Sequence, residues 1–165
     1  MMISNETIEC LNELIQQGFI LNRLWDRALS VLSVDFAMNK FAKIFHEGLA
    51  HRFPVDWSDY FSDILAQYNV KAAYYATPTD VSEYASPLEF FNKNLEYHTK
   101  TYELLKKSIN VAVLNGDINV EKALNHFVLV FNHYMEQALL LKDKAVACGG
   151  NWFFFDDMCD DFFLF

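Results

Sequence analysis

Residues that interrupt helices or build tight loops are scarce in this chain, which has five glycines and three prolines among 165 residues. The glycines form neither a P-loop nor a GxGxxG pattern, so the common phosphate-binding loops are excluded. Cysteine is also rare, with three residues and no CxxC pair. This count indicates neither a disulfide framework nor a CxxC zinc site, and unpaired thiols are typical of a reducing cytoplasm.

Positive charge and long apolar runs are lacking as well. The formal net charge is −9, whereas binding to nucleic-acid phosphates needs a basic face. No uninterrupted apolar run approaches the roughly 18 residues of a membrane span, and the acidic N-terminus lacks the basic start of a signal peptide. We therefore expect a cytoplasmic protein that binds neither nucleic acid nor membranes.

Helical periodicity extends over almost the whole chain. Hydrophobic residues make up 53% of the sequence and include 16 phenylalanines, which is enough for a packed core in a single domain. Four long stretches repeat apolar residues every three or four positions, as amphipathic helices do. They cover residues 5–32, 35 to the low 60s, 88–114 and 119–146.

The connections between these stretches determine the topology. Residues 33–35 and 115–117 are short turns, which place consecutive helices antiparallel, whereas residues 70–87 form a long connection. About 17 residues can span roughly 55 Å, more than the roughly 42 Å of a helix of about 28 residues. The second and third helices can therefore run parallel. We predict an all-α fold over residues 1–148, an antiparallel four-helix bundle with one long crossover.

Three segments of the sequence resemble one protein family. MNKFAKIFHEGLAHRF is similar to the second-helix region of ferritins, LEFFNKNLEYHTKTYELL to the start of their third helix, and HYMEQALLLKDKA to their fourth helix. The resemblance covers roughly residues 5–146 and extends equally to Dps-like proteins, so it indicates the ferritin-like superfamily. It implies a protein that binds iron or a similar metal, with ferroxidase-type oxidation or storage. It also implies a di-iron site with one Glu on each of two helices and a Glu-x-x-His pair on each of the other two.

That site cannot be transferred residue by residue, because the sequence contains no Glu-x-x-His. The second helix offers Glu47 and His51 instead, which are four residues apart and so share a helical face. Two interpretations are open: the pair binds a metal, or it is an ordinary exposed pair. Its position nearly opposite the apolar stripe of Phe41, Phe45 and Leu49 favours the exposed pair.

His98 lies within the apolar stripe of the third helix, between Leu95 and Tyr102. A buried neutral imidazole needs hydrogen-bond partners for its ring nitrogens. A neighbouring hydroxyl or carbonyl group would make His98 a satisfied core residue. The alternative is a metal ligand, a common role of imidazole.

Pro54 lies inside the second helical stretch, where a proline costs about 3 kcal/mol and kinks the helix. The apolar stripe also shifts by roughly 120° across it, and one inserted residue, a π-bulge, would nearly restore the phase. The bulged geometry is favoured and turns Asp56, Asp59 and Asp63 toward water. Without a bulge they enter the bundle near His98, where buried carboxylates would require a metal or protons. The candidate metal ligands are Asp59, Asp63, His98, Glu47 and His51.

The segment 149–165 lies beyond the predicted bundle and contains the sequence NWFFFDDMCDDFFLF, with seven aromatic residues and four aspartates. So many exposed phenylalanines would promote aggregation, so a free tail is not expected. Two interpretations are open. The tail packs over the bundle as a strap, or it is a peptide that docks on a protein partner.

The first and fourth helices each carry a second apolar strip, which includes Ile20, Leu24 and Val31 on the first and Leu129 and Leu140 on the fourth. A second strip indicates contact with a further element or subunit, so we expect a homo-oligomer, a dimer or larger. This suggests an alternative to metal handling: a non-enzymatic oligomeric interaction or scaffold bundle that lacks a functional di-iron centre.

Overall fold

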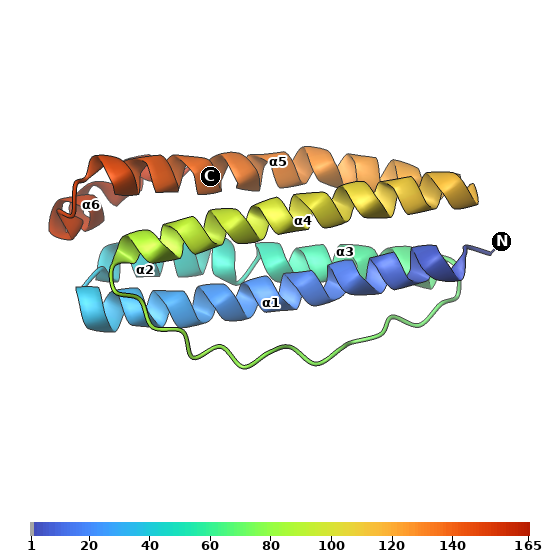
Figure 1. Ribbon diagram of the computed structural model, residues 1–165, viewed down its shortest axis with the longest axis horizontal. Helices are drawn as coiled ribbons and strands as arrows, with labels where there is room; N and C mark the ends of the chain where they lie inside the picture. The colour runs from blue at the N-terminus through green and yellow to red at the C-terminus, as the bar shows by residue number, and fades with distance from the viewer. Residues whose placement is uncertain (1) are drawn as a thin grey trace.

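The computed structural model describes residues 2–165 and shows four long helical segments packed side by side (Figure 1). The elements are α1 (Asn5–Phe36), α2 (Asn39–Phe45), the π-helical turn η1 (His46–Ala50), α3 (Phe53–Gln67), α4 (Pro87–Asn115), α5 (Ile118–Ala147), α6 (Trp152–Met158) and the 3-10 turn η2 (Cys159–Phe162). Together α2, η1 and α3 form the second helix of the bundle. No strand occurs between residues 2 and 165, and the predicted all-α four-helix bundle is confirmed.

Each end of α1 is set by a cap. At its start Ser4 accepts a hydrogen bond from the backbone N–H of Thr7 at 3.1 Å, as an N-cap does. At its end the helix continues through the turn expected at residues 33–35 and stops at Ala37, whose φ is 55°. The backbone N–H of Met38 then donates to the carbonyl of Leu32 at 3.0 Å. Met38 is fully buried and anchors this end, so the turn follows residues 33–35 instead of occupying them.

The second helix is interrupted ahead of Pro54. The turn η1 is a π-helix, and α3 then starts anew with Pro54 in its first turn, where proline is tolerated. The predicted inserted residue is therefore present. Beyond it Trp57 and Phe61 are buried, while Asp59 and its acidic neighbours face solvent.

Asn22 compensates for the hydrogen bond that this proline removes. In a continuous α-helix the carbonyl of Ala50 would accept from the N–H of residue 54, but proline has none. The side-chain amide of Asn22 on α1 donates to that carbonyl instead, at 3.0 Å. The break in the second helix is thus tied directly to α1.

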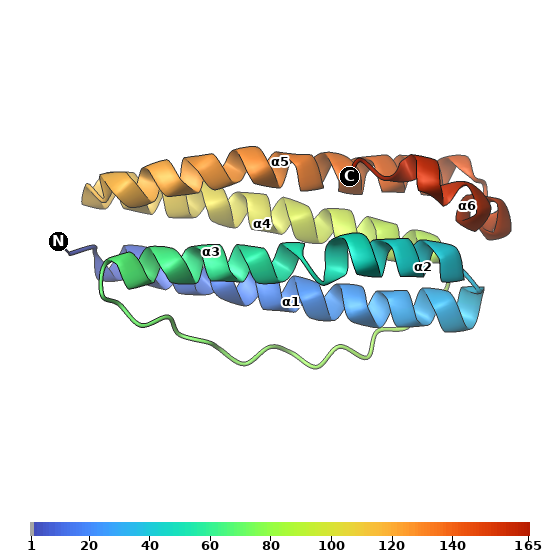
Figure 2. The same cartoon turned by 180° about the vertical axis from the view of Figure 1, so that it is seen from behind.

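The crossover, residues 68–86, runs alongside α1 from one end of the bundle to the other (Figures 1 and 2). Asn12 accepts from the backbone N–H of Ala73 at 2.9 Å, and Arg27 donates to the carbonyl of Ser82 at 3.0 Å. On α1, Leu24 is only 4% exposed beside this segment. The second apolar strip of α1 therefore meets the crossover of its own chain.

The C-terminal segment folds back over the bundle as a strap (Figure 2). Phe155 is fully buried, and its ring centroid lies 5.6 Å from that of Phe41 on α2. The side chain of Gln137 on α5 donates to the carbonyl of Phe162 at 2.9 Å and accepts from the backbone N–H of Leu164 at 2.6 Å. The strap therefore bridges α2 and α5.

None of the helices between residues 2 and 165 combines the length and apolar character needed to cross a lipid bilayer.

Candidate metal centre

Aromatic rings fill the middle of the bundle. Trp25 from α1 lies 4.9 Å from Phe45 of α2 and 6.1 Å from His98 of α4, measured between ring centroids. Phe131 of α5 lies 5.8 Å from His98 on the other side. The remaining cavity beside these rings measures about 10 Å³, which is near the lower limit for one water molecule. This cavity has no room for a pair of metal ions.

The polar groups on this axis bond to one another. The indole N–H of Trp25 donates to the side-chain oxygen of Asn94 at 2.8 Å. The Nδ1 atom of His98 lies 2.7 Å from the backbone carbonyl of Asn94. Because that carbonyl can only accept, Nδ1 carries the proton. Burial lowers the pKa of His98 to about 4, so the ring is neutral at pH 7.

No carboxylate joins His98 on the bundle axis within residues 2–165. Among residues 2–165 the only buried acidic side chain is that of Asp117. It lies at the end of the bundle, where its carboxylate accepts a hydrogen bond from the hydroxyl of Thr7 at 2.6 Å. Some of the acids on the helix surfaces pair with lysines, as Glu13 does with Lys107 at 3.2 Å. The axis residues are aromatic rings, amides and one neutral imidazole. They do not fit the carboxylate-rich donor set of a di-iron centre.

The extra residue in η1 brings two histidines together at the side of the bundle. The rings of His46 and His51 have centroids 3.9 Å apart, and Asp26 of α1 faces them. One ligand atom from each of these three side chains lies within 4.8 Å of the other two. His46 is half-buried, whereas Asp26 and His51 are exposed. This lateral cluster has the chemistry of a metal site, with two imidazoles and one carboxylate.

The predicted ligands are distributed differently from the expectation. Asp59 and Asp63 are exposed on α3, and His98 is buried on α4, so this predicted group does not form. The cause is the bulge, which rotates α3 and turns its aspartates outward. Glu47 is exposed, and His51 meets His46 rather than Glu47.

Comparisons with known proteins place this geometry in a fold family. No protein-family model and no curated protein matches the sequence. Among solved structures, an open pore ferritin from the archaeon Archaeoglobus fulgidus matches with a TM-score of 0.90 and 17% identity, over 100% of this chain and 99% of that one. A PmFTN variant soaked in iron matches with a TM-score of 0.84 and 19% identity, over 94% and 99%. The chain has the ferritin-like fold.

Within this ferritin-like fold, the lateral cluster contains two residues that sequence analysis did not select. Asp26 carries no signal of its own, because an exposed acid on an amphipathic helix is ordinary. His46 lies five residues before His51, a spacing that brings side chains together only where the helix has a π-turn. Sequence phase predicted the bulge near Pro54 but did not position it at residues 46–50.

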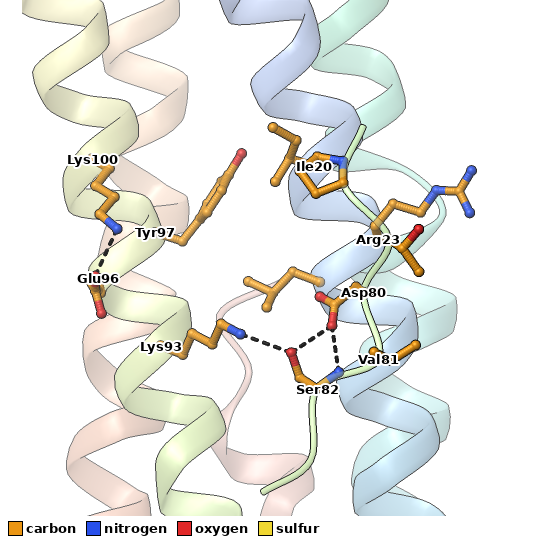
Figure 3. Close-up of a pocket in the computed structure, with 12 residues that line it drawn as sticks. Ile20, Arg23, Asp80, Val81, Ser82, Lys93, Glu96, Tyr97 and Lys100 are labelled. Carbon is orange, nitrogen blue, oxygen red and sulfur yellow. Dashed lines mark hydrogen bonds and ion pairs between the residues drawn. The ribbon is translucent and has the colours of Figure 1, made fainter. Parts of the chain in front are cut away.

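The ferritin-like fold also leaves a surface pocket of about 490 Å³ between α1, α4 and the crossover (Figure 3). Its charged groups are largely engaged with their neighbours. Lys93 donates to the hydroxyl of Ser82 at 3.0 Å, and Glu96 pairs with Lys100 at 2.8 Å. Neither histidine nor cysteine lines it. Its lining mixes apolar side chains with these engaged charges, and it offers no imidazole or thiol to a metal ion.

Proposed function

We propose that this chain is an assembly-forming subunit with the ferritin-like fold that lacks a ferroxidase centre in its own bundle. The observation that carries the proposal is the closed bundle axis, where Trp25, Phe45, His98 and Phe131 occupy the space between the helices. A di-iron centre needs several carboxylates around two ions, and these side chains supply none. The chain would contribute structure rather than iron oxidation.

Exposed apolar side chains support self-association. Leu139 and Val146, seven residues apart on one face of α5, are 44% and 57% exposed. Large apolar groups that remain in water are typical of contact surfaces. A homo-oligomer would cover them. The alternative to this homo-oligomer is a different protein partner that binds residues 151–165.

A second candidate function is iron storage by such an assembly. The observation that favours it is the fold itself, since structural neighbours include ferritins, one of them a variant soaked in iron. In this case iron would enter the assembly without being oxidised in this chain's bundle. The three unpaired cysteines support a reducing cytoplasm as the compartment for either function.

Two measurements on the purified full chain test the main proposal. Oxygen consumption after addition of Fe(II) in air-saturated buffer should not exceed that of protein-free buffer, while a ferritin with an intact centre should give a fast burst. Light scattering should give a native mass of several times the chain mass of 19.2 kDa. A burst that consumes two Fe(II) per chain would contradict the missing centre, and a mass of one chain would contradict assembly. Iron retained after aerobic loading and gel filtration would favour the storage function.

A further inference from the structure

The lateral cluster of Asp26, His46 and His51 lies outside the bundle axis on which the proposed function rests. We propose that these three side chains bind one divalent transition-metal ion at the side of the bundle, between α1 and η1. The site is built by the π-turn and does not depend on a di-iron centre. It is also independent of whether the chain assembles.

The π-turn is what places the two imidazoles together. In an α-helix, residues five apart lie about 140° apart around the axis, so His46 and His51 would point in different directions. In η1 the backbone N–H of His51 lies 3.4 Å from the carbonyl of His46, the five-residue spacing of a π-helix. The two rings consequently meet with centroids 3.9 Å apart. Such bulges occur frequently at functional sites.

The third donor is held in place by a neighbouring residue on α1. Asn22, one helical turn before Asp26, donates to the carbonyl of Ala50 at 3.0 Å. Because residues four apart share a helical face, this bond fixes the face of α1 that carries Asp26 against η1. The carboxylate and the two imidazoles therefore come from two elements in fixed relation. The positions are set by the bundle and not by loop flexibility.

The spacing of the donors suits an ion. Their ligand atoms lie within 4.8 Å of one another, and ligands bound at about 2.0–2.2 Å in tetrahedral geometry stand roughly 3.4 Å apart. Small side-chain rotations would close the difference. Within residues 2–165, none of these three side chains has a hydrogen bond or an ion pair to another residue. Their polar atoms converge but do not bond to one another, so they remain available as ligands.

The donor types select the class of metal. Two imidazoles and one carboxylate suit Zn²⁺, Fe²⁺, Co²⁺ or Ni²⁺, whereas Mg²⁺ and Ca²⁺ prefer sites made of oxygen atoms. Three protein ligands leave at least one coordination position open. Because Asp26 and His51 are exposed, water can fill that position. The site therefore has the composition of an accessible centre and not of a closed structural one.

Calorimetric titration of the untagged full chain with Zn²⁺ tests the proposal. We expect one strongest site per chain, with affinity lowered at least about tenfold in H51Q and in D26N, because each change removes a direct ligand. H126Q on α5 and D59N on α3 are matched controls, since both change exposed side chains, and both should retain wild-type affinity. Circular dichroism would verify that every variant is folded.

A second readout separates ligation from general attraction of cations to an acidic surface. Co²⁺ bound by imidazoles gives visible absorption bands, which should appear in the wild type and in H126Q and disappear in H46Q. Wild-type protein that binds no Zn²⁺, or H51Q and D26N variants that bind it as tightly as the wild type, would overturn the proposal. These titrations measure neither Fe(II) oxidation nor native mass. The lateral site can therefore be absent while the proposed function is correct, and it can be present while the proposed function is wrong.

Discussion

His98 illustrates what the sequence predicts at the scale of a single residue. Its place between Leu95 and Tyr102 in a periodic stripe was enough to predict burial, and the side chain is 1% exposed. Its bonding partner could not be predicted, because the Nδ1 atom contacts the backbone carbonyl of Asn94, an acceptor that every residue offers. The core interpretation holds for His98, since the carboxylates that would make it a metal ligand are absent from its surroundings.

The buried imidazole predicts a pH dependence of stability. Burial lowers the pKa of His98 in the folded chain from 6.5 to about 4, so between these values the unfolded chain binds a proton that the folded chain does not. The free energy of unfolding should therefore fall as pH drops from about 6.5 to about 4, by up to about 3 kcal/mol from this residue. Urea unfolding across this range measures it. Replacement by a non-titrating ring in H98F should flatten the slope, and an unchanged slope would contradict the assignment.

At the scale of the element, the second helix shows what the angular position of an apolar stripe can and cannot predict. The jump of the apolar stripe across Pro54 predicted one inserted residue, and that prediction is confirmed by η1. The angular shift between the apolar stripes before and after Pro54 shows only that one residue is inserted between them. It does not show where, so the bulge could not be located at residues 46–50. For the same reason, His51 was selected as a candidate ligand but its partners His46 and Asp26 were not.

The close contact between α1 and α3 beside this break predicts a large effect of a small substitution. A Cβ atom at Gly18 would lie 2.8 Å from the carbonyl oxygen of Pro54 and would clash with the hydroxyl oxygen of Ser58. The Ser58 hydroxyl is itself held by the carbonyl of Ile15 at 3.0 Å. G18A should therefore lower the free energy of unfolding by about 1–3 kcal/mol through overpacking, although alanine alone favours a helix.

The matched control for this prediction is G48A in η1. There the three atoms nearest to the added Cβ all belong to the ring of Phe165, a side chain that is 60% exposed and has space to rotate away. Chemical denaturation of both variants should show the larger loss for G18A. An equal or larger loss for G48A would mean that the strap, and not the contact between α1 and α3, is the tighter constraint.

At the scale of the whole molecule, the lengths of the connections determined the fold. Two short turns and one long crossover between four amphipathic stretches predicted the topology, because few arrangements satisfy those lengths. The path of the last residues was not predictable, since the tail has no regular period. Its position depends on particular contacts, such as the carboxylate of Asp156, which accepts the backbone N–H of Phe41 at 2.8 Å near the start of α2.

Removal of residues 151–165 should destabilise the bundle. Phe155 and Phe162 are 0% and 9% exposed, and the burial of one Phe is worth roughly 1.5–3 kcal/mol against a typical total stability of about 5–15 kcal/mol. The truncated chain should melt at a lower temperature with the native mass unchanged. Unchanged melting together with a loss of assembly would instead identify the tail as a docking peptide.

The closed bundle axis is tested most directly by anomalous X-ray scattering at the iron edge from crystals soaked in Fe(II). No iron peak is expected among Trp25, Phe45, Asn94 and His98, because their rings and amides fill the space between α1, α2 and α4. A pair of iron peaks at this position would contradict this expectation, since two ions there would require the aromatic core to open and carboxylates to turn inward.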